Sequence, residues 1–231
     1  MFRKETVAAL SVALLLGIFF FIPSSCLDGI IPDAVLSHRT GGPLLVLAVS
    51  GIFLLPGLMT AAMAFSFIGD LCGSYHFFIG QMSAFAAAHL MMIIYFITRM
   101  RKDGRGRSRR QKSFVYLGTT VAVCLFVFAA IYIVPHAPAG VIRTGCTIYS
   151  LLICTMLATA LMQRNGILAA GAILFVFSDA VLAWNKFVSP VEGQKYLIMI
   201  PYYGAQMLIW LKAAEDRLLR SKGTGFKKSN G

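Results

Sequence analysis

The sequence is poor in charged residues, and acidic residues are the scarcest of them. Only 13% of its 231 residues are charged, and nine Asp and Glu stand against 21 Lys and Arg. Because 58% of the residues are hydrophobic, the chain carries more apolar surface than one water-soluble core can bury. The composition therefore excludes an ordinary soluble domain and indicates a membrane protein with several spans.

Closely spaced cysteines are also lacking. The five cysteines include no Cys-x-x-Cys pair, so neither a zinc site nor a disulfide framework is indicated. Cys26 poses a separate question, because basic residues, an apolar run and Pro23-Ser24-Ser25 precede it as in a lipoprotein signal peptide. A proline directly before Ser24 fits that signal badly, and we therefore treat the segment as the first membrane span.

Apolar stretches recur along the chain, with Pro, Gly or clusters of charge between them. About eight of them are suited to crossing a bilayer, and all should be helices because lipid offers the backbone no other hydrogen-bonding partner. Only Pro56 and Gly57 interrupt the long run after Gly42, which leaves either a tight helical hairpin or one kinked helix. We predict an all-α polytopic membrane protein, a single domain over 1–231, with spans near 6–23, 42–55, 57–72, 78–99, 113–134, 139–162, 166–187 and 194–212.

The distribution of basic residues predicts the orientation of these spans. With a cytoplasmic N-terminus, the outer side keeps only Arg39, Arg143, Lys186 and Lys195, as the positive-inside rule expects. Most of the remaining Lys and Arg residues lie in a basic linker, 100–112, and in a basic tail, 213–231. The linker lacks interleaved aromatic residues, which argues against nucleic acid as a partner and favours anionic lipid headgroups. We expect an integral protein of a bacterial inner membrane with both termini in the cytoplasm.

Two aspartates lie inside otherwise apolar stretches, and each closes a similar phrase. The phrases are FSFIGD, which ends at Asp70, and FVFSD, which ends at Asp179. A carboxylate at membrane depth is costly unless it lies in a protected polar cavity, so we predict a buried diacid site. The recurrence also predicts two parallel four-helix repeats, about 1–99 and 113–212, whose third helices carry the acids at similar depth.

Other polar residues in the predicted spans could join the two acids. Among them, His89 follows an alanine-rich segment that allows close helix approach. Any of these residues, and the aspartates too, could instead form only hydrogen bonds between helices. The candidates that we expect to support the site are His89, Tyr149, Ser178, Asn185, Tyr202, Tyr203 and Gln206.

Several of these residues lie in stretches that resemble the YhhN family of integral-membrane lysoplasmalogenases. The most specific stretch is GAILFVFSDAVL, which begins at Gly171. The others are Gly69-Asp70, Gly80-Gln81, AFAAAH ending at His89, Asn185-Lys186-Phe187 and YYGAQ beginning at Tyr202. The resemblance covers most of the third to eighth spans. One departure is Gly42-Pro43, which stands where a Lys-Pro pair is expected.

The resemblance implies hydrolysis of the vinyl ether bond of lysoplasmalogens, which gives a fatty aldehyde and a glycerophospho-base. Asp70 and Asp179 match the family's two acidic positions, so one would donate a proton and the other would activate water, in an order that stays open. His89 and Tyr203 would position the water or tune the acids, while Tyr149 and Asn185 would bind the glycerol or phosphate. We expect a lysophospholipid as the partner and no cofactor or metal.

Two other functions fit the same residues. Acids near the midplane of repeated halves also occur in secondary transporters, so the chain could be a proton-coupled carrier of small molecules. Asp70, His89 and Asp179 could instead ligate a divalent metal that activates water for hydrolysis of another lipid. A dead-end pocket would favour a hydrolase, and a cavity open alternately to both sides would favour a carrier. The headgroup and the oligomeric state stay open.

Overall fold

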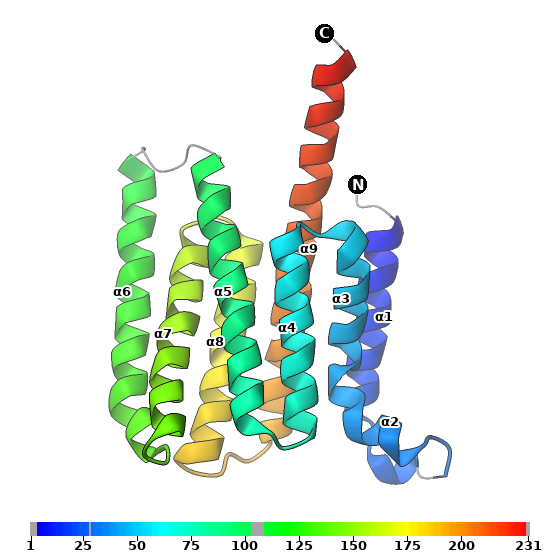
Figure 1. Ribbon diagram of the computed structural model, residues 1–231, viewed down its shortest axis with the longest axis vertical. Helices are drawn as coiled ribbons and strands as arrows, with labels where there is room; N and C mark the ends of the chain where they lie inside the picture. Colours follow the sequence, from blue (N-terminus) through cyan, green and yellow to red (C-terminus); the bar gives the residue numbers. More distant parts are fainter. Residues whose placement is uncertain (1–3, 28, 103–108, 230–231) are drawn as a thin grey trace.

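The computed structural model describes residues 4–27, 29–102 and 109–229, and over these residues the chain folds into helices joined by short loops (Figure 1). Residues 103–108 of the predicted basic linker and the last two residues of the predicted tail lie outside the described residues. The all-α prediction is confirmed. The α-helices are α1 (Lys4–Phe21), α2 (Asp33–His38), α3 (Gly42–Leu54), α4 (Gly57–Ser74), α5 (Phe78–Lys102), α6 (Arg109–Tyr132), α7 (Val141–Leu161), α8 (Gly166–Phe187) and α9 (Gln194–Ser229).

Six of these helices are long and apolar enough to cross a membrane, namely α1, α4, α5, α6, α7 and α8. The 13 residues of α3 fall short of a full span, and the charged C-terminal part of α9 extends beyond its apolar part. The prediction of a polytopic membrane protein is therefore confirmed, whereas the count of eight spans stays a prediction. Leu55 and Pro56 adopt extended backbone between α3 and α4, so this segment is a helical hairpin and not one kinked helix.

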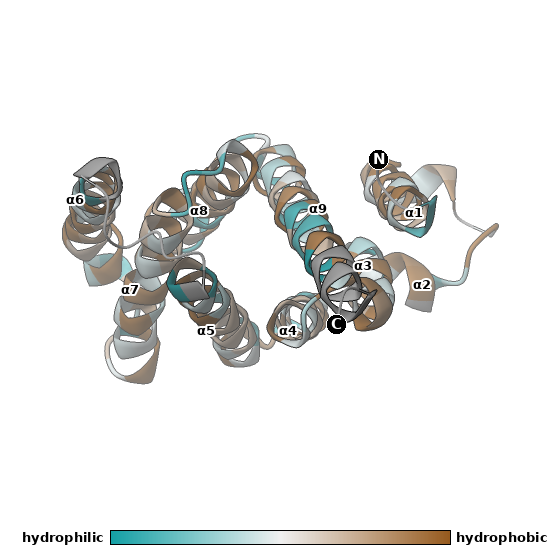
Figure 2. Ribbon diagram, turned by 90° about the horizontal axis from the view of Figure 1, so that it is seen from above, coloured by the Kyte–Doolittle hydropathy of each residue, from teal (hydrophilic) through white to brown (hydrophobic). Residues whose placement is uncertain are grey.

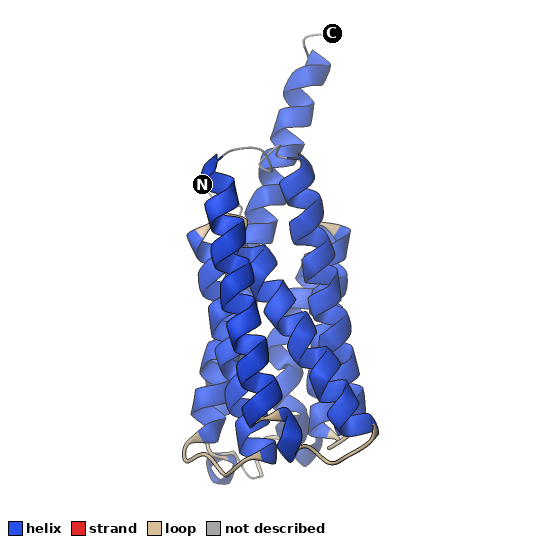
Figure 3. Cartoon of the chain, turned by 90° about the vertical axis from the view of Figure 1, so that its left-hand side faces the viewer, coloured by secondary structure: helices blue, strands red, loops and turns tan. Residues whose placement is uncertain are grey.

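The helices run up and down along one bundle axis. The start of α1, the end of α5, the start of α6 and the end of α9 lie at the same end, which we call the basic end (Figures 1 and 3). Both α4 and α8 run away from the basic end, in the same direction as each other (Figure 1). The membrane side of this end and the internal repeat stay predictions.

Five helices, α4, α5, α7, α8 and α9, form a ring around the centre of the bundle (Figure 2). Within the ring, α4 packs closely along α5, and α8 along α9. A glycine lies at each of these two contacts. A β-carbon at Gly69 would lie 3.0 Å from the ring of Phe85, and one at Gly171 would lie 2.8 Å from Ile209. Small residues at these positions therefore let the acid-bearing helices approach their partners closely.

A buried polar network holds the basic end of the ring together. The Asp216 carboxylate on α9 pairs with Arg99 on α5 at 2.8 Å and with Lys212 at 3.3 Å, and it accepts a hydrogen bond from Tyr95 at 3.1 Å. Gln163, just after α7, accepts from Arg99 and donates to the Phe96 carbonyl oxygen. We call these residues the Arg99–Asp216 network. It joins α5, α7 and α9 through ion pairs and hydrogen bonds shielded from solvent.

Candidate active site

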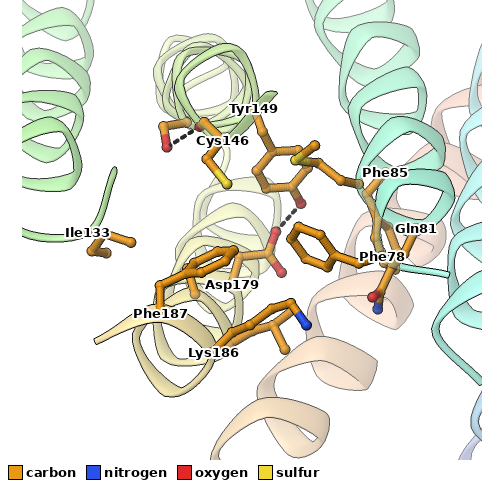
Figure 4. A pocket seen from close by; sticks show the side chains of 13 residues that line it. Phe78, Gln81, Phe85, Ile133, Cys146, Tyr149, Asp179, Lys186 and Phe187 are labelled. Carbon is orange, nitrogen blue, oxygen red and sulfur yellow. Dashed lines mark hydrogen bonds between the residues drawn. The ribbon is translucent and has the colours of Figure 1, made fainter. Parts of the chain in front are cut away.

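Asp179 belongs to a chain of three polar side chains from three helices. Its Oδ2 accepts a hydrogen bond from the Tyr149 hydroxyl of α7 (Figure 4). The same hydroxyl lies 3.1 Å from Nε2 of His89 on α5, and that nitrogen lies 3.8 Å from Asp179 Oδ2. Because the hydroxyl has one proton and gives it to Asp179, Nε2 must donate in its contact with Tyr149. The neighbours thus surround one oxygen of Asp179 with donors.

Asp70 lies on α4 in a less polar setting. The residue is buried, at 5% exposure, and lines the same cavity as Tyr202. Within the part of the chain that the structure describes, no hydrogen bond reaches Asp70 Oδ2 or the Tyr202 hydroxyl. His89 Nδ1 and Gln206 Oε1 are likewise buried and unpaired. Since buried polar atoms are nearly always hydrogen-bonded, these four atoms have the capacity to bind water or a ligand.

Both aspartates line one polar cavity of about 550 Å³. The volume lies in the range of small-molecule sites. The deep part of its wall includes Ser178 from α8 and Tyr202 from α9, whereas Ser37, His76 and Gln194 lie at helix ends opposite the basic end. The cavity therefore reaches the surface at the end away from the Arg99–Asp216 network.

A second, smaller pocket of about 60 Å³ shares part of its wall with the first, and Figure 4 shows the side chains that line it. Its wall is largely apolar and comes from α5, α7, α8 and the segment after α6. Gln81, Phe85, Asp179 and Leu182 line both spaces, so Asp179 stands where a polar cavity meets an apolar one. We call the smaller space the apolar side pocket. Its remaining lining residues are Phe78, Met82, Ile133, Cys146, Tyr149, Ser150, Ala183, Lys186 and Phe187.

Five of the predicted site residues line one or both of these spaces, namely Asp70, Tyr149, Ser178, Asp179 and Tyr202, whereas His89, Tyr203 and Gln206 line neither. Tyr203 donates to the Thr40 carbonyl oxygen at 2.8 Å, and Gln206 donates to Ser66 at 3.0 Å, so both also tie α9 to its neighbours. Ser178 donates to the Ile198 carbonyl oxygen at 2.9 Å while it lines the cavity.

Asn185 occupies a different place. Its Oδ1 accepts from the Val191 backbone N–H at 2.9 Å, which closes the loop between α8 and α9, and it lines neither space.

The sequence analysis missed several residues of the wall. Gln81 and Phe85 precede His89 by two turns and one turn of α5, so all three lie on one helix face, and that spacing could have revealed them. Lys195 and Thr40 come from helix ends without any motif. Among the described residues, no three His, Cys, Asp or Glu side chains are grouped to hold a metal ion, so Asp70, His89 and Asp179 form no such set.

The fold and the site together define a class: polytopic helical membrane proteins whose two intramembrane acids share an internal cavity. The chain belongs to the YhhN family, whose model matches residues 40–213. The resemblance seen in the sequence is thus confirmed.

The relatives carry one kind of name. The chain is 31% identical over 163 residues to lysoplasmalogenase TMEM86B of Sus scrofa, covering 70% of this chain and 66% of the relative. It is 32% identical over 168 residues to the Rattus norvegicus protein of that name, covering 72% and 63%. A shorter match, 53% over 47 residues and 20% of each chain, is to lysoplasmalogenase TMEM86A of Bos taurus. The chain spans slightly less than two thirds of the length of these two TMEM86B relatives, and no solved structure matches it.

Proposed function

We propose that the protein is a membrane-embedded hydrolase that cleaves the vinyl ether bond of lysoplasmalogen-type lysophospholipids. The observation that carries this proposal is the shared cavity of Asp70 and Asp179, with donors gathered around one acid and none bonded to Oδ2 of the other. Relatives named lysoplasmalogenase supply the substrate class. The products are a fatty aldehyde and a glycerophospho-base.

The reaction needs one group that gives a proton and one that takes a proton. Protonation of the alkene carbon yields an oxocarbenium ion, water adds to it, and the hemiacetal collapses to the aldehyde and the free alcohol. Asp179 suits the base, because Tyr149 donates a hydrogen bond to its Oδ2 and so orients the carboxyl group as an acceptor. Asp70, buried beside Tyr202 without a bond to Oδ2, suits the proton donor.

The two adjoining spaces suit the two parts of such a substrate. The polar cavity would take the glycerol and headgroup, and the apolar side pocket would take the first carbons of the alkenyl chain. The scissile bond would then lie beside Asp179, where the spaces meet. His89 and Tyr149 would hold Asp179 in place from the far side.

The direct test is aldehyde release by the purified protein in detergent, supplied with a 1-alkenyl lysophosphatidylethanolamine. We expect aldehyde from the alkenyl lipid and no product from the saturated 1-alkyl analogue, because only the alkenyl lipid can form an oxocarbenium ion by protonation of carbon. Cleavage of a 1-acyl lysophospholipid at a similar rate would indicate an esterase and contradict the proposal, as would the absence of aldehyde from well-folded protein.

Tyr149→Phe is expected to lower kcat about 10- to 100-fold. The substitution removes one hydrogen bond to a charged group, a loss of about 1.5 to 3 kcal/mol, and it disconnects His89 from Asp179. The measurement is kcat across pH, since a purely structural loss would not change the profile. Tyr116→Phe on α6, where the ring is largely exposed, is the matched control and should leave kcat unchanged.

Ala183→Leu is expected to raise KM for long-chain substrates about tenfold. A larger side chain here occupies the apolar side pocket, and a methylene or two in such a pocket is worth about 1 to 3 kcal/mol. The measurement is KM against chain length. Ala170→Leu adds the same side chain to an exposed position of α8 and serves as the control. Equal KM values in both variants would show that the alkenyl chain of the substrate binds elsewhere.

We also propose that the bundle is built from two related halves, α1 with α3 to α5 and α6 to α9, with the basic end in the cytoplasm. The helix contacts support the two halves, because α3 contacts α9 across the halves just as α7 contacts α5, and α4 pairs with α5 as α8 pairs with α9.

The orientation can be tested with fusions to the C-terminal helix. A fluorescent reporter fused after Ser229 should fold and emit, whereas a periplasmic phosphatase fused there should stay inactive; the reverse result would overturn the orientation.

A further inference from the structure

Two cations share one aromatic ring at the outer part of the polar cavity: Lys195 lines the cavity, and Arg39 lies beside it without lining it. Arg39 Cζ lies 5.7 Å from the centre of the Phe20 ring, and Lys195 Nζ lies 4.8 Å from the same centre. Phe20 and Lys195 both line the polar cavity, as does Thr40, the neighbour of Arg39. The bundle therefore brings like charges together beside the route to the aspartates.

No acidic residue in the described ranges of the chain forms an ion pair with either cation. The Arg39 guanidinium donates instead to neutral acceptors, the Ile22 carbonyl oxygen at 2.9 Å and Ser24 Oγ at 3.3 Å. Two neighbouring cations repel each other unless an anion lies between them. Their placement at a half-buried cavity mouth thus favours an anionic ligand.

The segment that carries Arg39 is held firmly against α9. Tyr203 donates to the Thr40 carbonyl oxygen, and its ring packs edge-on against Phe20 at 5.9 Å. Lys195 begins the same helix, two turns and about 10 Å before Tyr202. An extended glycerophosphate, met by a long lysine side chain, can bridge that separation. The positions of both cations relative to the acids are therefore fixed by α9.

We propose that Arg39 and Lys195 bind the phosphodiester of the substrate's headgroup and thereby set the depth at which its vinyl ether bond meets the aspartates. The assignment rests on the proposed function for the identity of the lipid. Arg39 can offer a planar pair of donors and Lys195 a point charge, the two modes by which proteins hold phosphate. They are binding residues and take no part in proton transfer.

The test measures binding of two lipids that the protein cannot cleave, the saturated 1-O-hexadecyl-glycerophosphoethanolamine and 1-O-hexadecylglycerol, which lacks phosphate. Lys195→Met is expected to weaken binding of the phospholipid about tenfold, as loss of a charged contact does, and to leave the phosphate-free lipid unaffected. Arg39→Lys, which keeps the charge but not the planar donors, should show a smaller loss. Arg143→Gln is the control, since Arg143 bonds the carbonyl oxygens of Pro135 and Ala137 outside the cavity.

Two results would overturn the assignment. The first is an equal loss of affinity for both lipids in Lys195→Met, which would point to general damage at the mouth. The second is competition by inorganic phosphate as strong as that by glycerophosphoethanolamine, which would make this a free-phosphate site. Because neither lipid is cleaved, the binding result stands whatever the aldehyde assay gives, and the two proposals can fail separately.

Discussion

Asp179→Asn is expected to lower the rate of aldehyde release by about 10³-fold or more, and Asp70→Asn by a similar factor. An asparagine keeps the shape of each side chain but can neither take the proton from water nor give one to the alkene carbon, and such steps are worth about 10²- to 10⁴-fold each. Since the two acids act in one reaction, the double variant should be little slower than either single one. The measurement is kcat with an alkenyl lysophospholipid.

Asp33→Asn is a suitable control for these variants. Asp33 begins α2 on the protein surface and lines neither the polar cavity nor the apolar side pocket, so its loss should leave kcat unchanged. Thermal unfolding in detergent would confirm that each variant is folded. Full activity in both Asp70→Asn and Asp179→Asn would refute the acid and base mechanism, even if the vinyl ether bond is indeed the one cleaved.

Arg99→Met is expected to destabilise the protein by about 3 to 5 kcal/mol. That figure is the upper bound, because a buried charge left with no partner costs that much, whereas Asp216 here keeps its ion pair with Lys212. The measurement is the free energy of unfolding in detergent with increasing denaturant. Catalysis at low temperature should be little affected, because the network lies at the end away from the mouth of the polar cavity.

A double variant distinguishes the free-energy cost of leaving one buried charge unpaired from the stability that the intact ion pair contributes. Arg99→Met combined with Asp216→Leu removes both charges and leaves Lys212 paired with Glu215 at 2.6 Å. We expect it to be more stable than Arg99→Met alone, since apolar residues often replace a buried ion pair at little cost. The double variant could instead lose as much stability as Arg99→Met and Asp216→Leu lose in sum. In that case the network contributes through its hydrogen bonds and not through its charges.

The Arg99–Asp216 network also bears on the transporter hypothesis. A carrier with alternating access would have to part α5, α7 and α9 at the basic end, which means breaking several buried polar contacts at once. The exposed residues of the polar cavity's wall lie instead at the opposite end. These observations favour a dead-end site over a path through the membrane.

Helix positions were largely predictable from the sequence, because a membrane span must be helical and because Pro, Gly or charged residues separate the apolar stretches. The predicted span 166–187 coincides with α8, and Pro56 marks the break that separates α3 from α4. The two acids could also be singled out, since charge inside an apolar run is costly and therefore conspicuous.

The rest of the site depends on contacts between distant segments, which no local pattern reports. Arg39 and Lys195 meet at one ring because the segment before α3 packs on α9, and in the sequence they look like ordinary outer-side cations. Asn185 shows the converse, because as a polar residue of a predicted span it was expected to bind the glycerol or phosphate, whereas its side chain closes a loop.

The shared wall between the polar cavity and the apolar side pocket has a consequence for what happens after cleavage. The boundary between the polar cavity and the apolar side pocket is formed by Gln81, Phe85, Asp179 and Leu182. An amphiphile whose bond is cleaved at this boundary is divided between its polar part and its apolar part. In the proposed reaction each product then already occupies surroundings that suit it, with the glycerophospho-base in the polar cavity and the start of the aldehyde chain in the apolar side pocket.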